Sequence, residues 1–122
     1  MATTGKRGRM SEVEKMYELA VINKKCIDKR YEKCTGVCYD CKYFIYPPFS
    51  AEKQIAILQL LTQRCDLTIS HFGEWEFIHY DGREPLEIKG KDFTETFAKL
   101  ISAYWQDLTE SEREQIAEIL RR

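Results

Sequence analysis

The chain has 122 residues, of which 43% are hydrophobic and 32% are charged, and its formal net charge is −1. This length favours one domain with one hydrophobic core. The longest apolar run, "IAILQLL", is far shorter than the roughly 20 residues of a membrane-spanning helix. The composition is therefore typical of a globular protein, and it argues against a membrane protein or a disordered chain.

The charge is divided unevenly along the chain. Residues 1–42 contain ten Lys and Arg against six Asp and Glu, whereas residues 43–122 contain nine against fourteen. An anionic partner is therefore expected at the first third, and the remainder would repel it. A solvated surface of mixed charge is the simpler interpretation of the same numbers.

Residues 1–10 predict a flexible basic tail, and residues 11–122 predict a single α+β domain. The tail lacks the apolar stretch of a secretory signal, which favours a reducing cytoplasm. "MSEVEKMYELAVINKK" predicts a helix, because Ser11 and Glu14 have the spacing of a capping box. Its apolar stripe is clear as far as about Val21, and the helix ends near Asn23 or continues to Tyr31.

Residues 24–49 form a Cys-rich segment, within which residues 34–49 are expected to be a loop. Cys26, Cys34, Cys38 and Cys41 have the spacing C-x7-C-x3-C-x2-C. Tetrahedral zinc binds four thiolates, and the pair in "CYDC" is typical of half such a site. The pattern predicts a structural zinc that orders this segment.

Three other interpretations of the cysteines stay open. Cysteine often packs as a small hydrophobic residue, and Cys26 and Cys65 fit that role best. Disulfides are disfavoured by the expected compartment and the odd count of five cysteines. "CTGVCYDC" also has the spacing of an iron–sulfur loop resembling radical S-adenosylmethionine enzymes, but the chain is far shorter than their barrel.

Basic and aromatic residues surround the cysteines, a combination typical of single-strand nucleic-acid binders. The candidate nucleic-acid contacts are Lys24, Lys25, Lys29, Arg30, Lys33, Lys42 and Tyr39. Solvated lysines and tyrosines that dock the loop are the alternative.

The middle of the chain predicts a helix followed by a small antiparallel β-meander. Ser50 caps the helix "AEKQIAILQLLTQRC", which is apolar nearly all round and is expected to be central and well covered. The strands are "LTISHF", "EWEFIHY" and "PLEIK". Pairing Tyr80 with Pro85 places Phe77 opposite Ile88, and Ile78 and Tyr80 then face outward.

The last third predicts two more helices. "FTETFAKLISAYWQDL" follows Asp92 and carries one strongly apolar face, and Thr109 with Glu112 forms a capping box before the final helix. The expected fold is a small three-stranded antiparallel β-meander packed with about four helices and a Cys-rich loop.

Two groups of residues suggest a function. His71 and His79 lie on adjacent predicted strands and would be the residues of an enzyme, although satisfied core histidines fit the pattern better. No complete catalytic motif is present, so a non-catalytic protein is expected. Ile78 and Tyr80, with the apolar strip Ala98, Ile101 and Trp105, are candidates for a protein or homodimer interface, unless the strip meets the first or last helix.

The C-terminal half, from "EKQIAILQLL" to "GKDFTETFAKLISAYWQDLTESEREQIAEIL", resembles short uncharacterised proteins of bacteriophages and integrated elements in Gram-positive bacteria. The resemblance implies an accessory protein in the cytoplasm of a bacterial host cell that binds a macromolecular partner. Some such proteins inhibit host defence systems, including CRISPR nucleases. The resemblance includes no catalytic motif and assigns no functional residue. A small zinc-stabilised nucleic-acid-binding protein is the alternative.

Overall fold

The computed structural model describes residues 11–27 and 43–122, which contain four α-helices and two small antiparallel sheets. The helices are α2 (Glu12–Leu19), α3 (Ala51–Thr62), α4 (Phe93–Tyr104) and α5 (Glu110–Arg121), with a short 3-10 helix η2 (Trp105–Asp107) after α4. The strands are β1 (Lys25–Cys26), β2 (Phe44–Ile45), β3 (Asp66–His71), β4 (Trp75–Tyr80) and β5 (Leu86–Gly90). The predicted α+β class, meander and four helices are confirmed; most of the predicted Cys-rich loop lies outside the described residues.

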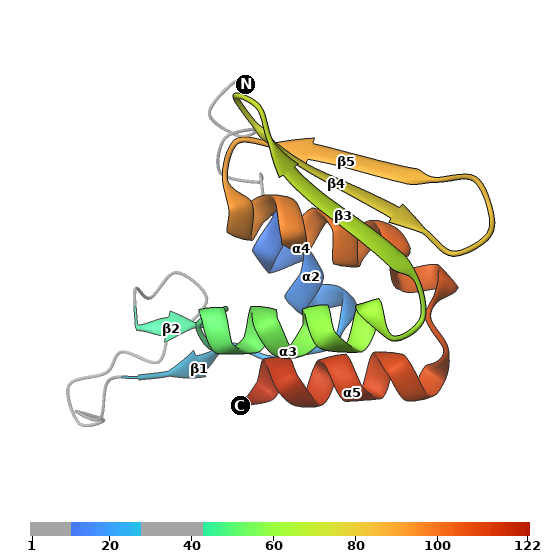
Figure 1. The fold of residues 1–122 in the computed structure, drawn as a ribbon. Helices are drawn as coiled ribbons and strands as arrows, with labels where there is room; N and C mark the ends of the chain where they lie inside the picture. Colours follow the sequence, from blue (N-terminus) through green and yellow to red (C-terminus); the bar gives the residue numbers. More distant parts are fainter. Residues whose placement is uncertain (1–10, 28–42) are drawn as a thin grey trace, which may run out of the picture.

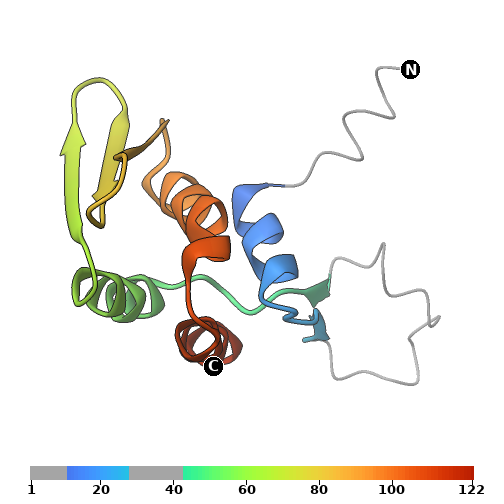
Figure 2. The same ribbon diagram turned by 90° about the vertical axis from the view of Figure 1, so that its right-hand side faces the viewer.

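Helix α4 is at the centre of the molecule. The three-stranded sheet packs on one side of α4 and α2 packs on the opposite side, while α3 and α5 lie together beneath them (Figures 1 and 2). This order follows from α4's sequence, because it has apolar residues on two faces: Phe97 and Leu100 are fully buried, and so are Ala98 and Ile101. No helix in the described ranges is long and apolar enough to cross a membrane.

Both predicted capping boxes are confirmed. The Ser11 Oγ accepts from the Glu14 N–H at 3.1 Å, and the Glu14 Oε1 accepts from the Ser11 N–H at 3.1 Å. Thr109 and Glu112 repeat the arrangement at the start of α5. Each box satisfies main-chain donors that have no partner within the helix, and it therefore fixes the first residue of the helix.

Helix α2 ends earlier than either predicted end. Its last residue is Leu19, and Val21 has the left-handed φ of 57°. The Ile22 N–H donates to the Tyr17 carbonyl at 2.9 Å and the Val21 N–H to the Glu18 carbonyl at 3.0 Å. These two hydrogen bonds form a Schellman motif, which stops the helix although no glycine is present.

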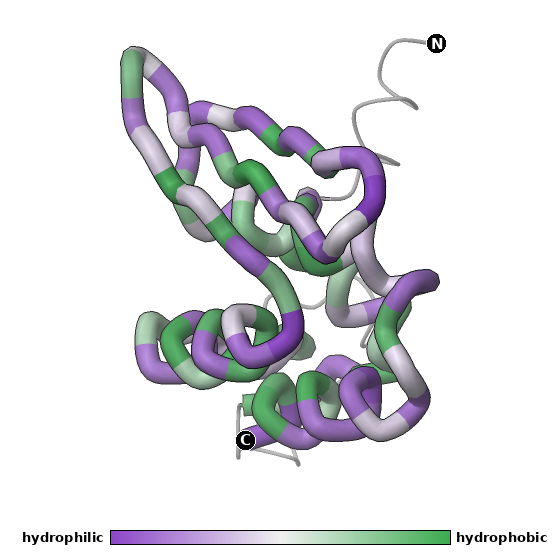
Figure 3. Tube along the Cα trace, turned by 45° about the vertical axis from the view of Figure 1, so that its right-hand side comes forward, coloured by the Kyte–Doolittle hydropathy of each residue, from purple (hydrophilic) through white to green (hydrophobic). Residues whose placement is uncertain are grey.

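The β4–β5 register is the predicted one, with Phe77 opposite Ile88 and His79 opposite Leu86. Hydrophobic and hydrophilic residues alternate along the strands (Figure 3), so that one face packs on α4 and the other faces away. Strand β5 ends at Gly90, where an added Cβ would collide with the Thr96 hydroxyl. Glycine therefore permits the close approach of β5 to α4.

Aromatic side chains hold the segment after β2 against the helices. The Tyr17 ring stacks on Tyr46 at a centroid distance of 4.9 Å, and the Tyr17 hydroxyl donates to the Pro47 carbonyl at 2.6 Å. Burial raises the pKa of Tyr17 to about 12. Phe49 continues the cluster by stacking on Phe97 at 6.1 Å.

The prediction that the second helix is central and well covered is wrong. Helix α3 packs mainly on α5 and its Ile55 is 55% exposed, whereas the polar Lys53 and Gln54 are buried. The Lys53 Nζ donates to the Leu120 carbonyl at 3.2 Å, at the C-terminal end of α5, where the helix dipole favours a cation. Burial lowers the pKa of Lys53.

Strands β1 and β2 pair where the sequence predicted a helix end and a loop. Lys25 lies opposite Ile45 and Cys26 opposite Phe44, and the Ile27 N–H donates to the Tyr43 carbonyl at 2.8 Å. The pairing places residues 27 and 43 side by side.

Candidate functional site

The predicted zinc site is only partly covered by the structure. Cys26 is exposed on β1, and Cys34, Cys38 and Cys41 lie outside the described residues. Within residues 11–27 and 43–122, no group of three or more His, Cys, Asp and Glu side chains could hold a metal ion. Cys65 lies apart from Cys26, and its thiol donates to the Leu61 carbonyl at 3.1 Å, a structural role at the end of α3.

The predicted nucleic-acid contacts are also mostly outside the described residues: Lys29, Arg30, Lys33, Lys42 and Tyr39. Lys25 is exposed. The Lys24 Nζ lies 5.3 Å from the centre of the Tyr46 ring, a cation–π contact that engages this lysine within the protein.

The predicted protein-binding residues divide into two pairs. Ile78 and Tyr80 lie on the side of the sheet that faces away from α4, and Tyr80 is 44% exposed. Ile101 and Trp105 are only 1% and 8% exposed, so their prediction as a free interface is wrong. Ile101 lies in α4, against which α2 packs, and Trp105 lies in η2, the 3-10 helix that follows α4.

The two histidines do not converge. His71 lies opposite Trp75 at the turn end of the β3–β4 hairpin, whereas His79 lies opposite Leu67 near its other end. His71 is exposed and its ring contacts Trp75, with a centroid distance of 4.6 Å. An enzyme that uses both histidines at one centre is therefore incompatible with this fold.

A polar network surrounds the buried hydroxyl of Tyr104. This hydroxyl donates to the Asp81 Oδ2 at 2.7 Å and accepts a hydrogen bond from Arg64. Arg64 also forms an ion pair with the Glu112 Oε2 at 2.6 Å. Burial and the Asp81 carboxylate raise the pKa of Tyr104, so its hydroxyl keeps its proton. The network joins four parts of the chain: the turn between α3 and β3, the β4–β5 turn, α4 and α5.

Arg83 extends this network at the surface. Its guanidinium lies 3.9 Å from the Asp81 Oδ2 and 3.4 Å from the Asp107 Oδ1. The hydrogen bond from Tyr104, the Arg83 N–H and the Arg83 charge lower the pKa of Asp81. Asp81 is therefore held as an anion between a tyrosine and an arginine.

His79 lies beside this network and is 2% exposed. Its ring centre is 3.7 Å from that of Tyr104. Its Nε2 is buried and has no hydrogen-bond partner. Burial lowers the pKa of His79, and the neighbouring Arg64 lowers it further, while Asp81 raises it.

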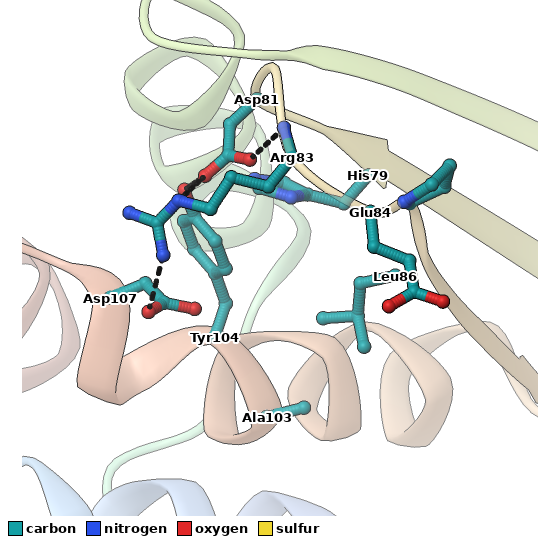
Figure 4. A pocket seen from close by; sticks show the side chains of 9 residues that line it. His79, Asp81, Arg83, Glu84, Leu86, Ala103, Tyr104 and Asp107 are labelled. Atoms are coloured by element: carbon teal, nitrogen blue, oxygen red, sulfur yellow. Dashed lines mark hydrogen bonds and ion pairs between the residues drawn. The ribbon is translucent and has the colours of Figure 1, made fainter.

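These groups line a pocket of about 240 Å³ between the β4–β5 turn and α4. Its lining consists of His79, Asp81, Arg83, Glu84, Pro85, Leu86, Ala103, Tyr104 and Asp107. Figure 4 shows these side chains around an open space, with the His79 ring on the strand side and Tyr104 on the helix side. The lining combines three carboxylates and one guanidinium with a histidine whose pKa is lowered and a tyrosine whose pKa is raised, so both shifts favour the neutral side chain.

The side of the sheet that faces away from α4 is a second candidate. We call it the outer face, and it comprises Asp66, Thr68, Ser70, Phe72, Glu76, Ile78, Tyr80, Glu87 and Lys89. Phe72 belongs to it because it lines a shallow hollow of about 120 Å³ with Ser70, Glu76 and Lys89. Phe72 is 90% exposed, and helices cover only the opposite side of the sheet in the described residues (Figure 2).

Sequence reasoning missed Phe72 as a surface residue and Tyr104 as the centre of a network. Phe72 ends an apolar alternation, and only the turn at Gly73, with φ of 79°, places it on the outer face. A tyrosine on the apolar face of a helix is expected to be buried, and a buried tyrosine hydroxyl usually has a hydrogen-bond partner. The position of Tyr104 on such a face therefore indicated that its hydroxyl has a partner. The partners are 23 and 40 residues away in the chain, so no local pattern identifies them.

The sequence matches no protein-family model, and comparisons with curated proteins and with solved structures found no match.

Proposed function

We propose that the protein acts by binding another protein through the outer face, without catalysing a reaction. The observation that carries this proposal is the exposure of Phe72, 90%, on a sheet that, within residues 11–27 and 43–122, helices cover from one side only. Tyr80 is 44% exposed near the other end of β4, and Ile78 lies between them on the same face. Exposed aromatic side chains that flank an apolar residue are typical of interface centres.

The charge of the outer face favours a basic protein surface as the partner. Asp66, Glu76 and Glu87 are acidic, and Lys89 is shared between Glu76 at 3.6 Å and Glu87 at 3.4 Å. The face therefore has an excess of negative charge that would repel nucleic acid and attract basic side chains.

The resemblance to short phage proteins directs the search for the partner to a bacterial host. An accessory protein of this kind would bind a host or phage protein in the cytoplasm, and a defence nuclease is one such target. A zinc-stabilised nucleic-acid-binding protein is the alternative, and it would use the basic segment around Cys26 in place of the outer face.

The first experiment compares surface variants in pull-downs from a Gram-positive host lysate, with and without nuclease. Phe72→Ser combined with Tyr80→Ser removes both aromatic residues of the outer face. Ile55→Ser is the matched control, because Ile55 is also exposed and apolar but lies on α3. We expect a protein partner that survives nuclease, binds wild type and the Ile55 variant equally, and is weakened at least about tenfold by the double variant.

Two results contradict the proposal. Recovery that disappears after nuclease would indicate nucleic-acid binding, and equal recovery by the double variant would exclude the outer face. In a third case, a second copy of the protein occupies the outer face. Light scattering, which measures the oligomeric state, would then show a wild-type dimer that the double variant converts to a monomer.

A further inference from the structure

The pocket between the β4–β5 turn and α4 contains a polar atom that the proposed function does not use. The His79 Nε2 is buried without a partner, in a residue that is 2% exposed. Buried polar atoms in folded proteins almost always have a hydrogen-bond partner. The missing partner is therefore expected to come from a molecule that enters the pocket.

The state of the histidine indicates which kind of hydrogen bond is missing. Burial favours the neutral ring, and the main-chain carbonyl of His79 itself is the nearby acceptor for a ring N–H. A neutral imidazole has one N–H and one acceptor nitrogen. With its N–H directed to the main chain, the ring presents Nε2 as an acceptor, so the incoming group must be a donor.

The charges around the pocket indicate the sign of that group. Asp81, Glu84 and Asp107 contribute three carboxylates to the lining, and Arg83 contributes the single cation. Arg83 is 69% exposed and already lies beside Asp81 and Asp107, which leaves Glu84 without an ion pair among the described residues. A cation entering here meets an excess of negative charge, whereas an anion would be repelled.

The walls indicate the rest of the ligand. Pro85, Leu86 and Ala103 give the pocket an apolar side. The pocket's volume, about 240 Å³, is several times the roughly 30 Å³ that one water molecule occupies in the liquid. An alkyl chain of a few carbons therefore fits along the apolar side with its charged end at the carboxylates.

We propose that this pocket binds an alkylammonium or alkylguanidinium group, whose N–H donates to the His79 Nε2 and whose charge is balanced by Glu84, the lining carboxylate that Arg83 does not pair with. The group belongs to a free amine or to a lysine or arginine side chain of another protein. The site is independent of the outer face, because His79 and Leu86 point to the opposite side of the sheet.

The test is an NMR titration of the isotopically labelled protein with n-butylguanidinium. At about 50 mM, which saturates a millimolar site, we expect saturable shifts of the His79 ring, Leu86 and Ala103 signals. n-Butanol is the control for the alkyl chain and butyrate is the control for charge; neither should produce the shifts at equal ionic strength. Glu84→Gln should weaken binding several-fold, whereas the matched variant Glu87→Gln, on the outer face, should not.

His79→Phe keeps an aromatic ring beside Tyr104 but removes the acceptor, and it should weaken binding at least about tenfold. A titration with a blocked Gly-Arg-Gly peptide distinguishes a free amine from a protein side chain as the ligand. NMR shifts at lower concentration than with n-butylguanidinium indicate a protein side chain. No shifts indicate a free amine. Three results would overturn the proposal: no saturable shifts, equal shifts with n-butanol, or equal weakening by the Glu84 and Glu87 variants. Because Glu84→Gln and His79→Phe leave the outer face unaltered, failure here leaves the protein-binding proposal standing.

Discussion

Val21 is the residue at which the main chain adopts a conformation that its side chain disfavours. Its φ is 57°, and it is 78% exposed, so no packing compensates for the strain. The left-handed conformation costs an L-residue about 1–2 kcal/mol, and glycine avoids this cost. The Schellman motif at the end of α2 would therefore be more stable with glycine at this position.

Val21→Gly is expected to raise the free energy of unfolding by about 0.5–1 kcal/mol. Removing the strain of the left-handed conformation stabilises the folded state. The greater conformational freedom of glycine in the unfolded chain offsets part of this gain. Urea denaturation measures it. Val21→Ala is the control, because alanine keeps a Cβ and should gain less. A destabilised glycine variant would show that the left-handed turn is not present in solution.

The lowered pKa of His79 is expected to make the free energy of unfolding depend on pH. Its pKa is lowered in the folded protein from the ordinary 6.5, mainly by burial. Below about pH 6.5 the unfolded chain therefore binds a proton that the folded chain resists, and the free energy of unfolding falls as the pH falls. The charged groups around the ring are Asp81, Arg64 and Asp107.

We expect this loss to approach about 1.4 kcal/mol per pH unit between roughly pH 6.5 and the lowered pKa. Urea denaturation of wild type and His79→Phe at several pH values measures it, since the variant cannot titrate and should have the flatter profile. His71→Ala is the control for removing a histidine at an exposed position of the same sheet. An equal slope in wild type and the His79 variant would assign the pH dependence to other groups.

Among the elements, the β1–β2 pair bears most directly on the predicted zinc. It places residues 27 and 43 side by side, so the segment that contains Cys34, Cys38 and Cys41 begins and ends at one place. Cys26 lies at that same place, on β1. Because the two ends of this segment are already held together, bringing its cysteines to one metal ion costs less conformational entropy than it would in a chain with separated ends. This favours a single metal site.

Tag-free protein is therefore expected to contain about one zinc per chain, measured by elemental analysis. Cys38→Ser and Cys41→Ser should each lose it. Cys65→Ser is the matched control and should keep it, because the Cys65 thiol already has a partner, the Leu61 carbonyl, at 3.1 Å within α3. Less than half an equivalent of zinc in the wild-type protein would exclude the site.

Local elements were predictable because their signals are local. The Ser11–Glu14 and Thr109–Glu112 boxes begin helices where predicted, and alternation with a short turn gave the β4–β5 register. The end of α2 was not predictable, because it requires Val21 to adopt the left-handed conformation, which glycine usually occupies at this position.

At the scale of the whole molecule, packing decided what the sequence left open. The second apolar strip, with Ile101 in α4 and Trp105 in η2, suited a partner or a neighbouring helix, and both residues are buried, with α2 packed against α4. Likewise α3 is apolar nearly all round, but its neighbours leave Ile55 exposed. The candidate pocket was the least predictable feature, because Tyr104, Asp81 and Arg64 meet only when distant parts of the chain pack together.

The central place of α4 has a consequence for how the domain comes apart. The sheet and α2 each bury a face of this one helix, so neither can detach without uncovering apolar side chains that the helix shares with the rest of the core. Detaching either one would therefore expose part of the shared core, and the domain is expected to unfold as one cooperative unit. Phe72, at one end of the meander, is 90% exposed and lies outside this core, whereas the turn at the other end is joined to α4 and η2 by the Tyr104–Asp81 hydrogen bond and the Arg83–Asp107 ion pair.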